Sequence, residues 1–164
     1  MKKQGFTLIE LMVVIVIMGI LAAVAVPKLF GMIAKSKASE VGPAAGTYVK
    51  LQQAYISESD SVGTWALIGY KGPGEGDATS SATNNFEYSD GISAKAAIPS
   101  DATVGWTAHN KVKLNDCVAD DNWTVSVASA GTDGASGDAT FTAAVKDNNA
   151  DCVALTPSFS TIGK

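Results

Sequence analysis

The sequence predicts an α+β fold in which a long N-terminal helix packs on a small antiparallel sheet. Three observations predict it: a strongly apolar run from Phe6 to Val26, apolar residues at helical spacing to about Ser57, and period-two alternation beyond Thr103. The chain has 164 residues, which allows one modest domain with an appendage and excludes a large multidomain enzyme.

The charge is unevenly distributed along the chain. Twelve lysines, with no arginine, stand against 16 acidic residues, which gives a net charge of −4. Residues 58–164 hold six lysines and 14 acidic residues, a local balance of −8, whereas residues 28–57 hold four lysines and one glutamate. We therefore expect an acidic distal surface that does not bind nucleic acid directly.

The apolar run has the length of a membrane span. Its 21 residues, Phe6 to Val26, correspond to about 31 Å of helix, close to the thickness of one bilayer core. Lys2 and Lys3 precede it, so the rest of the chain is expected to face outward. The alternative is a secretory signal that is removed, because alanines near the end of the run imitate its cleavage site.

Glu10 is a carboxyl group inside this apolar run. Such a group costs about 2.5–3.5 kcal/mol near the bilayer centre. Either it reaches water at the membrane edge or is protonated in lipid, or it is kept for a charged partner. The residues alone leave these alternatives open.

The segment from Lys2 to Leu11, KKQGFTLIEL, followed by the apolar run, resembles the N-terminal signature of type IV pilins and the related pseudopilins of type II secretion. The resemblance implies the pilin fold and a cut by prepilin peptidase between Gly5 and Phe6, with methylation of the new Phe6 amine. It also implies that Glu10 meets the N-terminal amine of a neighbouring subunit during assembly.

Two residues of the long helix, Gly19 and Pro27, match positions that interrupt the helix in this family. Pro27 lacks an amide hydrogen and clashes with the carbonyl of Ala23, and Gly19 weakens a helix by about 1 kcal/mol. A simple kink at Pro27 is equally compatible with these properties. Pro43 follows a glycine, so we expect a second bend there.

The second half of the chain reads as loops followed by strands. Residues 58–102 are rich in Gly, Ser, Thr, Asn and Asp, and are expected to form a solvated surface that contacts neighbouring subunits or carries sugars. Beyond them, alternation predicts four strands separated by turns such as Gly131–Gly134. The predicted strands are Thr103–His109, Trp123–Ser129, Ala139–Val145 and Cys152–Thr156.

Cys117 and Cys152 are the two cysteines, and their spacing excludes a C-x-x-C motif. In an oxidising compartment the two cysteines are expected to form one disulfide. The alternative, in a reducing compartment, is two free thiols. A bridge resembles the disulfide-bounded C-terminal region of many pilins. We therefore divide the chain into a leader (1–5), a membrane or filament-core helix (6–27), an amphipathic helix (28–57), a loop-rich connection (58–102) and a disulfide-bounded sheet region (103–164).

The sequence contains no arrangement typical of an enzyme. His109 is the single histidine, stands in a predicted strand and has no nucleophile motif nearby, and no nucleotide-binding motif occurs. No cofactor is expected. Aspartates gather in the distal loops without EF-hand spacing, so Asp116, Asp120 and Asp121 are weak calcium candidates.

The resemblance implies a structural subunit of a type IV pilus, held in the inner membrane before assembly and part of an extracellular surface filament afterwards. Its partners would be copies of itself, prepilin peptidase, the assembly machinery and minor pilins. The filament would serve adhesion, twitching motility or uptake. The alternatives are a pseudopilin of type II secretion and a monomeric membrane-anchored binding domain.

Overall fold

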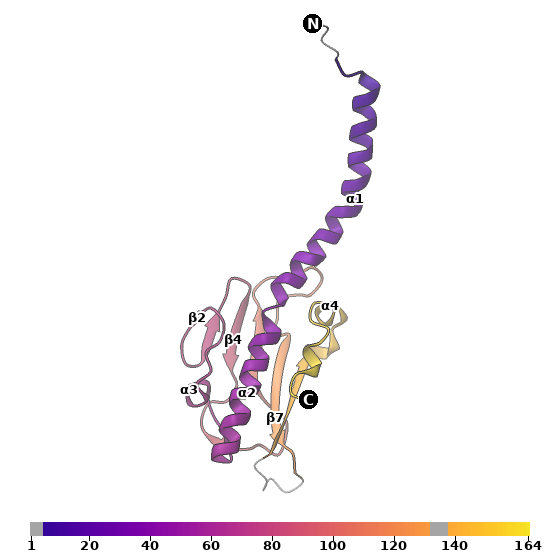
Figure 1. The fold of residues 1–164 in the computed structure, drawn as a ribbon. Helices are drawn as coiled ribbons and strands as arrows, with labels where there is room; N and C mark the ends of the chain where they lie inside the picture. The colour runs from indigo at the N-terminus through magenta and orange to yellow at the C-terminus, as the bar shows by residue number, and fades with distance from the viewer. Residues whose placement is uncertain (1–4, 132–137) are drawn as a thin grey trace.

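The computed structural model describes residues 5–131 and 138–164, and has the α+β architecture predicted from the sequence. A long helical rod stands clear of the folded part with its first half and packs on an antiparallel sheet with its second half (Figure 1). The first four residues of the predicted leader, and most of the predicted turn at Gly131–Gly134, lie outside the described residues.

The rod consists of two helices, α1 (Leu8–Ala38) and α2 (Val41–Ser59). Pro27 lies inside α1, which continues through it and is visibly bent along its length in Figure 1. The interruption between the helices falls at Ser39 and Glu40, just before the expected position at Pro43. Pro43 itself occupies the first turn of α2, where an amide hydrogen has no partner within the helix and its absence is tolerated.

The main sheet has six antiparallel strands in the order β2-β3-β4-β6-β7-β8. Its three C-terminal strands confirm the sequence prediction: β7 and β8 have the predicted bounds, and β6 is one residue longer. Their period-two alternation places one set of side chains against α2. These strands are β6 (Thr103–Asn110), β7 (Trp123–Ser129) and β8 (Ala139–Val145).

The connection expected to be loop-rich contributes half of this sheet. The strand β4 (Phe86–Asp90) pairs with β6 and buries Phe86 and Tyr88 while Glu87 faces solvent. Shorter strands extend the sheet beyond β4 or form a separate two-stranded ladder. They are β2 (Glu75–Gly76), β3 (Ser80–Ala82), and the ladder pair β1 (Ser61–Val62) and β5 (Ala96–Ala97).

The predicted strand at Cys152–Thr156 is wrong, because this segment begins as a short helix, α4 (Ala150–Val153). The Asn149 side chain accepts a hydrogen bond from the amide of Asp151 and caps the helix. This cap outweighs the weak alternation of a five-residue stretch. The remaining short helices are α3 (Trp65–Ile68) and two 3-10 turns, η1 (Lys146–Asn148) and η2 (Phe159–Thr161).

The core lies between α2 and the sheet and is built on aromatic side chains. Tyr48 of α2 meets Tyr70 edge to face with ring centroids 5.8 Å apart, and Trp123 of β7 meets Phe86 of β4 at 5.5 Å. Close approach of the two layers requires a glycine at one point, since a Cβ added at Gly105 would lie 2.2 Å from the Tyr48 hydroxyl oxygen.

Candidate functional site

The first half of α1 is an apolar surface that the folded part does not cover. Large apolar side chains from Phe6 to Ile33 are exposed, and Ala34 is the first buried residue of the helix. Within the described residues one helix is long and apolar enough to span a membrane, and its most apolar 18-residue window has a mean hydropathy of 2.9 with none of it buried. In water such a surface is unfavourable, so it requires lipid or another apolar surface.

Gly5 and Phe6 precede the first helical residue, Leu8, and are not part of a regular element. The Phe6 side chain is 87% exposed, and within residues 5–131 and 138–164 no atom beyond the chain neighbours of Gly5 lies within 4 Å of the position that a Cβ at Gly5 would take. The described residues therefore do not cover the bond between Gly5 and Phe6. Gly19 lies further along α1 and is likewise surrounded by open space.

Glu10 and Thr7 form a reciprocal cap at the start of α1. The Thr7 amide and hydroxyl donate to Oε2 of Glu10 at 2.8 and 2.7 Å, while the Glu10 amide donates to the Thr7 hydroxyl at 3.4 Å. The carboxylate thus lies at the positive end of the helix dipole. Because no group of this cap belongs to residues 1–5, a cut after Gly5 would leave it intact.

Glu40, at the junction of the two helices, is a structural residue that sequence reasoning missed. Its Oε1 accepts hydrogen bonds from the Thr83 hydroxyl at 2.6 Å and from the Tyr88 hydroxyl at 3.0 Å. Burial, with the Glu40 carboxylate second, raises the pKa of Tyr88 far above its usual range. Glu40 therefore fixes the start of α2 to β4 and to the turn between β3 and β4, and so sets how α1 leaves the folded part.

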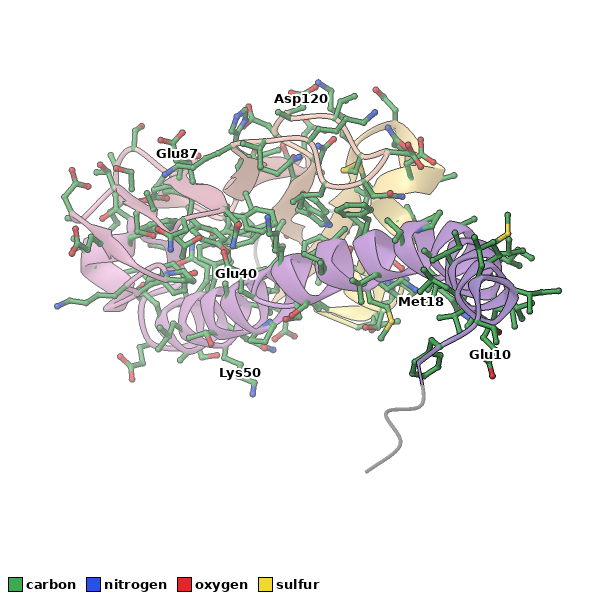
Figure 2. All side chains as sticks on the ribbon, turned by 90° about the horizontal axis from the view of Figure 1, so that it is seen from above. Glu10, Met18, Glu40, Lys50, Glu87 and Asp120 are labelled. Atoms are coloured by element: carbon green, nitrogen blue, oxygen red, sulfur yellow. A yellow bond between two sulfur atoms is a disulfide. The ribbon has the colours of Figure 1, made fainter. Side chains whose placement is uncertain are left out.

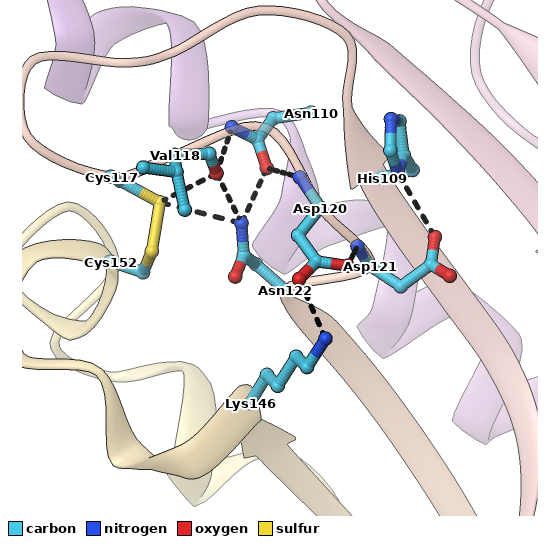
Figure 3. Close-up of polar contacts among 9 residues, drawn as sticks. All are labelled: His109, Asn110, Cys117, Val118, Asp120, Asp121, Asn122, Lys146 and Cys152. Atoms are coloured by element: carbon cyan, nitrogen blue, oxygen red, sulfur yellow. Dashed lines mark hydrogen bonds and ion pairs between the residues drawn. A yellow bond between two sulfur atoms is a disulfide. The ribbon is translucent and has the colours of Figure 1, made fainter.

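The structure joins Cys117, in the loop before β7, to Cys152 of α4 by a disulfide. Two buried asparagines support this loop (Figure 3). The side-chain amide nitrogen of Asn122, Nδ2, donates to Oδ1 of Asn110 at 2.6 Å and to the carbonyl of Val118 at 2.7 Å. Asn110 also donates to that carbonyl at 2.9 Å. These two asparagines could not be predicted from the sequence, because nothing in the sequence distinguishes a buried asparagine from one at the surface.

The three weak calcium candidates each face a basic side chain. Asp120 lies 2.6 Å from Lys146, Asp121 lies 3.1 Å from His109, and Asp116 lies 3.9 Å from Lys113. The hydrogen bond from Lys146 is the main cause that lowers the pKa of Asp120, and the same bond raises the pKa of Lys146. Over the ranges 5–131 and 138–164, no three His, Cys, Asp or Glu residues are grouped to hold a metal ion.

Comparison with known proteins adds to this geometry at the N-terminus. Residues 1–26 match the family described as the prokaryotic N-terminal methylation motif. Together with the exposed apolar helix and the sheet packed on α2, the match confirms the resemblance to type IV pilins.

Several relatives carry pilin or fimbrial names. The chain is 42% identical over 65 residues to the type IV major pilin protein PilA of Myxococcus xanthus, covering 40% of this chain and 30% of that protein. It is 44% identical over 63 residues to the fimbrial protein EcpC of Eikenella corrodens, covering 38% and 39%. It is 39% identical over 70 residues to the type IV major fimbrial protein FimA of Dichelobacter nodosus, covering 43% and 44%.

The matched part thus spans less than half the length of these relatives. No solved structure matches the chain significantly.

Proposed function

We propose that this chain is the structural subunit of a type IV pilus and polymerises through α1 into a surface filament. The observation that carries the proposal is the exposed, apolar first half of α1, most of which lies within the methylation motif matched by residues 1–26. Copies of the same helix can cover one another when the subunit leaves the membrane. The relatives named as pilins and fimbrial proteins support this role. It is a structural role with no reaction for the chain to catalyse.

Processing precedes assembly in this proposal. Prepilin peptidase hydrolyses the bond between Gly5 and Phe6 and methylates the Phe6 amine, removing the leader. The positive amine then sits one residue before the Thr7 cap, where the Glu10 carboxylate already lies. During assembly Glu10 of one subunit meets the amine of its neighbour, so that a charge pair selects the register of otherwise featureless apolar helices.

Before assembly the subunit is held in the inner membrane by α1. Lys2 and Lys3 keep the N-terminus on the cytoplasmic side, and the sheet domain faces the outer, disulfide-permissive space. The Cys117–Cys152 bridge is consistent with that topology. Assembly machinery and minor pilins supply the energy and the initiation, because the chain has no nucleotide-binding motif.

A pilus is favoured over a calcium-binding pseudopilin. Asp120 and Asp121 are each engaged with a cationic or ionisable partner, Lys146 and His109, and not with one another. Calcium sites need several convergent oxygen ligands. The acidic balance of residues 58–164 also argues that the filament does not capture DNA through this subunit's own charge.

The test is intact mass and N-terminal sequencing of protein sheared from the cell surface. The expected product is a fibre protein that begins at methylated Phe6 and is two hydrogens lighter than the fully reduced chain. A chain that begins at Met1, or one that begins after the apolar run, would overturn the proposal.

A further inference from the structure

A hollow of about 630 Å³ lies at the edge of the sheet domain, between α3 and β2. Figure 1 shows these two elements on the side of the domain opposite α4. The volume is within the range of small-ligand sites. The rim consists of exposed residues, and the floor consists of three buried ones, Trp65, Tyr70 and Ser81. We call this feature the edge hollow.

Two polar groups of the floor have no hydrogen-bond partner among the described residues. They are the indole nitrogen of Trp65, which is fully buried, and the hydroxyl of Ser81, which is 4% exposed. The Tyr70 hydroxyl differs, because it accepts from the Trp106 indole at 3.1 Å and donates to the carbonyl of Ala44 at 3.2 Å. Buried polar groups are nearly always paired with protein, water or ligand, because leaving them unpaired costs free energy. The floor therefore offers a ligand one N–H donor and one hydroxyl.

Glycines form the part of the wall that passes β3. A Cβ added at Gly72 would collide with the Ser81 hydroxyl, and one added at Gly76 would collide with the carbonyl of Ser80. Glycine is therefore required at both positions. As a result, the wall places no side chain of its own over the Ser81 hydroxyl.

The rim of the edge hollow carries two carboxylates and one ammonium group, from Glu75, Asp77 and Lys71. Glu75 and Lys71 form no ion pair within residues 5–131 and 138–164. Asp77 accepts from the amides of Thr79 and Ser80 at 2.7 and 2.9 Å through Oδ1, which leaves Oδ2 for another donor. The rim is therefore rich in acceptors and has a net negative charge.

These groups define the chemistry of a matching ligand. The carboxylates need hydrogen-bond donors, whereas the indole N–H needs an acceptor. Sugar hydroxyls supply both, and the C–H groups of a sugar ring are apolar enough to lie against aromatic edges. The negative rim disfavours an acidic sugar by charge repulsion.

We propose that the edge hollow binds a neutral saccharide of one or two rings, whose hydroxyls donate to Glu75 and Asp77 and accept from Trp65 and Ser81. A turn of the Ser81 side chain, or a small shift of the Gly72 backbone, opens the floor to the sugar. The inference goes beyond the pilus role, because every residue of the hollow belongs to the folded domain and none to α1.

The tryptophan indole N–H signals in nuclear magnetic resonance test the contact directly. The isotope-labelled full chain, in a detergent without a sugar head group, is titrated with maltose, cellobiose, lactose and N,N′-diacetylchitobiose. At least one sugar is expected to shift the Trp65 signal saturably, and Trp65→Phe assigns that signal. The signal of Trp123 is the internal control and should not move, because its N–H already donates to Thr156 at 2.7 Å.

Two results of this titration would overturn the proposal. The first is the absence of a saturable Trp65 shift with all four sugars, which would mean that water suffices for the floor groups. The second is an equal response to digalacturonate, because the negative rim should reject an acidic sugar.

Three variants locate the binding site. Ser81→Ala and Glu75→Gln are each expected to weaken the affinity for the responding sugar about fivefold or more. The thermal midpoint of Ser81→Ala should not fall, because the hydroxyl that it removes has no partner in the described structure. Glu87→Gln is the matched control, since Glu87 projects from the sheet face away from α2 (Figure 2) and does not line the hollow. It should bind like the unmodified chain.

Unchanged affinity in both Ser81→Ala and Glu75→Gln would overturn the assignment to the edge hollow, as would an equal loss in Glu87→Gln. The titration uses the unassembled subunit, so its result does not depend on filament formation. Failure of the pilus proposal would therefore leave this inference standing, and failure of sugar binding would leave the pilus proposal standing.

Discussion

The Tyr88 hydroxyl donates a 3.0 Å hydrogen bond to Oε1 of Glu40, which links a buried position of β4 to the junction of the two helices. The Thr83 hydroxyl donates to the same oxygen at 2.6 Å. Thr83 and Tyr88 each lie more than 40 positions from Glu40 in the chain. Through them, the sheet determines the direction in which the exposed helix leaves the folded domain.

Removing this link should destabilise the domain. Glu40→Ala leaves the buried Tyr88 hydroxyl without its acceptor and is expected to lower the free energy of unfolding by about 1–3 kcal/mol. Glu40→Gln keeps an acceptor oxygen and should cost less. Chemical denaturation of the full chain in detergent measures both variants, and equal losses for the two would contradict the role assigned to the acceptor.

Loss of the disulfide should have a larger effect. The bridge closes a loop between residues 35 positions apart, which corresponds to about 4 kcal/mol on the loop-entropy model. We expect a Cys117→Ser, Cys152→Ser chain to unfold at a markedly lower denaturant concentration. Adding reductant to the unmodified chain should reproduce the shift, and should leave the double variant unchanged.

The pair between Lys146 and Asp120 should act as a pH-dependent link between η1, which follows β8, and the loop before β7. The pKa of Asp120 is lowered by its hydrogen bond from Lys146, so its contribution is present above 3.8, the ordinary value, and is lost as the pH falls through the lowered one. The pKa of Lys146 is raised, so its contribution is present below 10.5 and is lost as the pH rises through the raised value.

The measurement is the difference in stability between the unmodified chain and a Lys146→Met variant across this range. The difference should be largest at neutral pH and should shrink at both extremes. A constant difference would indicate that the pair does not titrate as described. Both groups are exposed, so added salt should also reduce the effect.

Gly105 and Tyr48 should be coupled. Gly105→Ala places a Cβ 2.2 Å from the Tyr48 hydroxyl oxygen, and overpacking of this kind costs about 1–3 kcal/mol. That hydroxyl is buried and has no partner among the described groups, so Tyr48→Phe should be tolerated and should rescue Gly105→Ala. A double-mutant cycle measures the coupling, and strictly additive effects would show that the clash is relieved elsewhere.

Glu10 should matter for assembly and not for membrane insertion. Glu10→Gln keeps an acceptor for the Thr7 cap but removes the charge, whereas Glu10→Val removes both. We expect both variants to reach the membrane at normal levels and to reduce the sheared filament fraction at least tenfold. Normal filaments from Glu10→Gln would show that hydrogen bonding, and not charge, is the property that assembly requires.

Elements whose signal lies in consecutive residues were predictable. The apolar run of α1 and the alternation in β7 and β8 depend on neighbours along the chain, and these strands have the predicted bounds. The strand β4 was missed because its five residues stand within loop-like composition. The segment at Cys152 was misread because one capping side chain, Asn149, decides for a helix over a short alternation.

The sequence by itself therefore determined the exposed apolar helix, the methylation-type N-terminus and the strands that cover α2, since hydrophobic period and local motif are properties of adjacent residues. Only the tertiary structure decided which polar groups hold the domain together. Glu40 with Tyr88, and Asn110 with Asn122, are partners distant in sequence. Their pairing arises only once the layers have packed and buried polar groups must find partners.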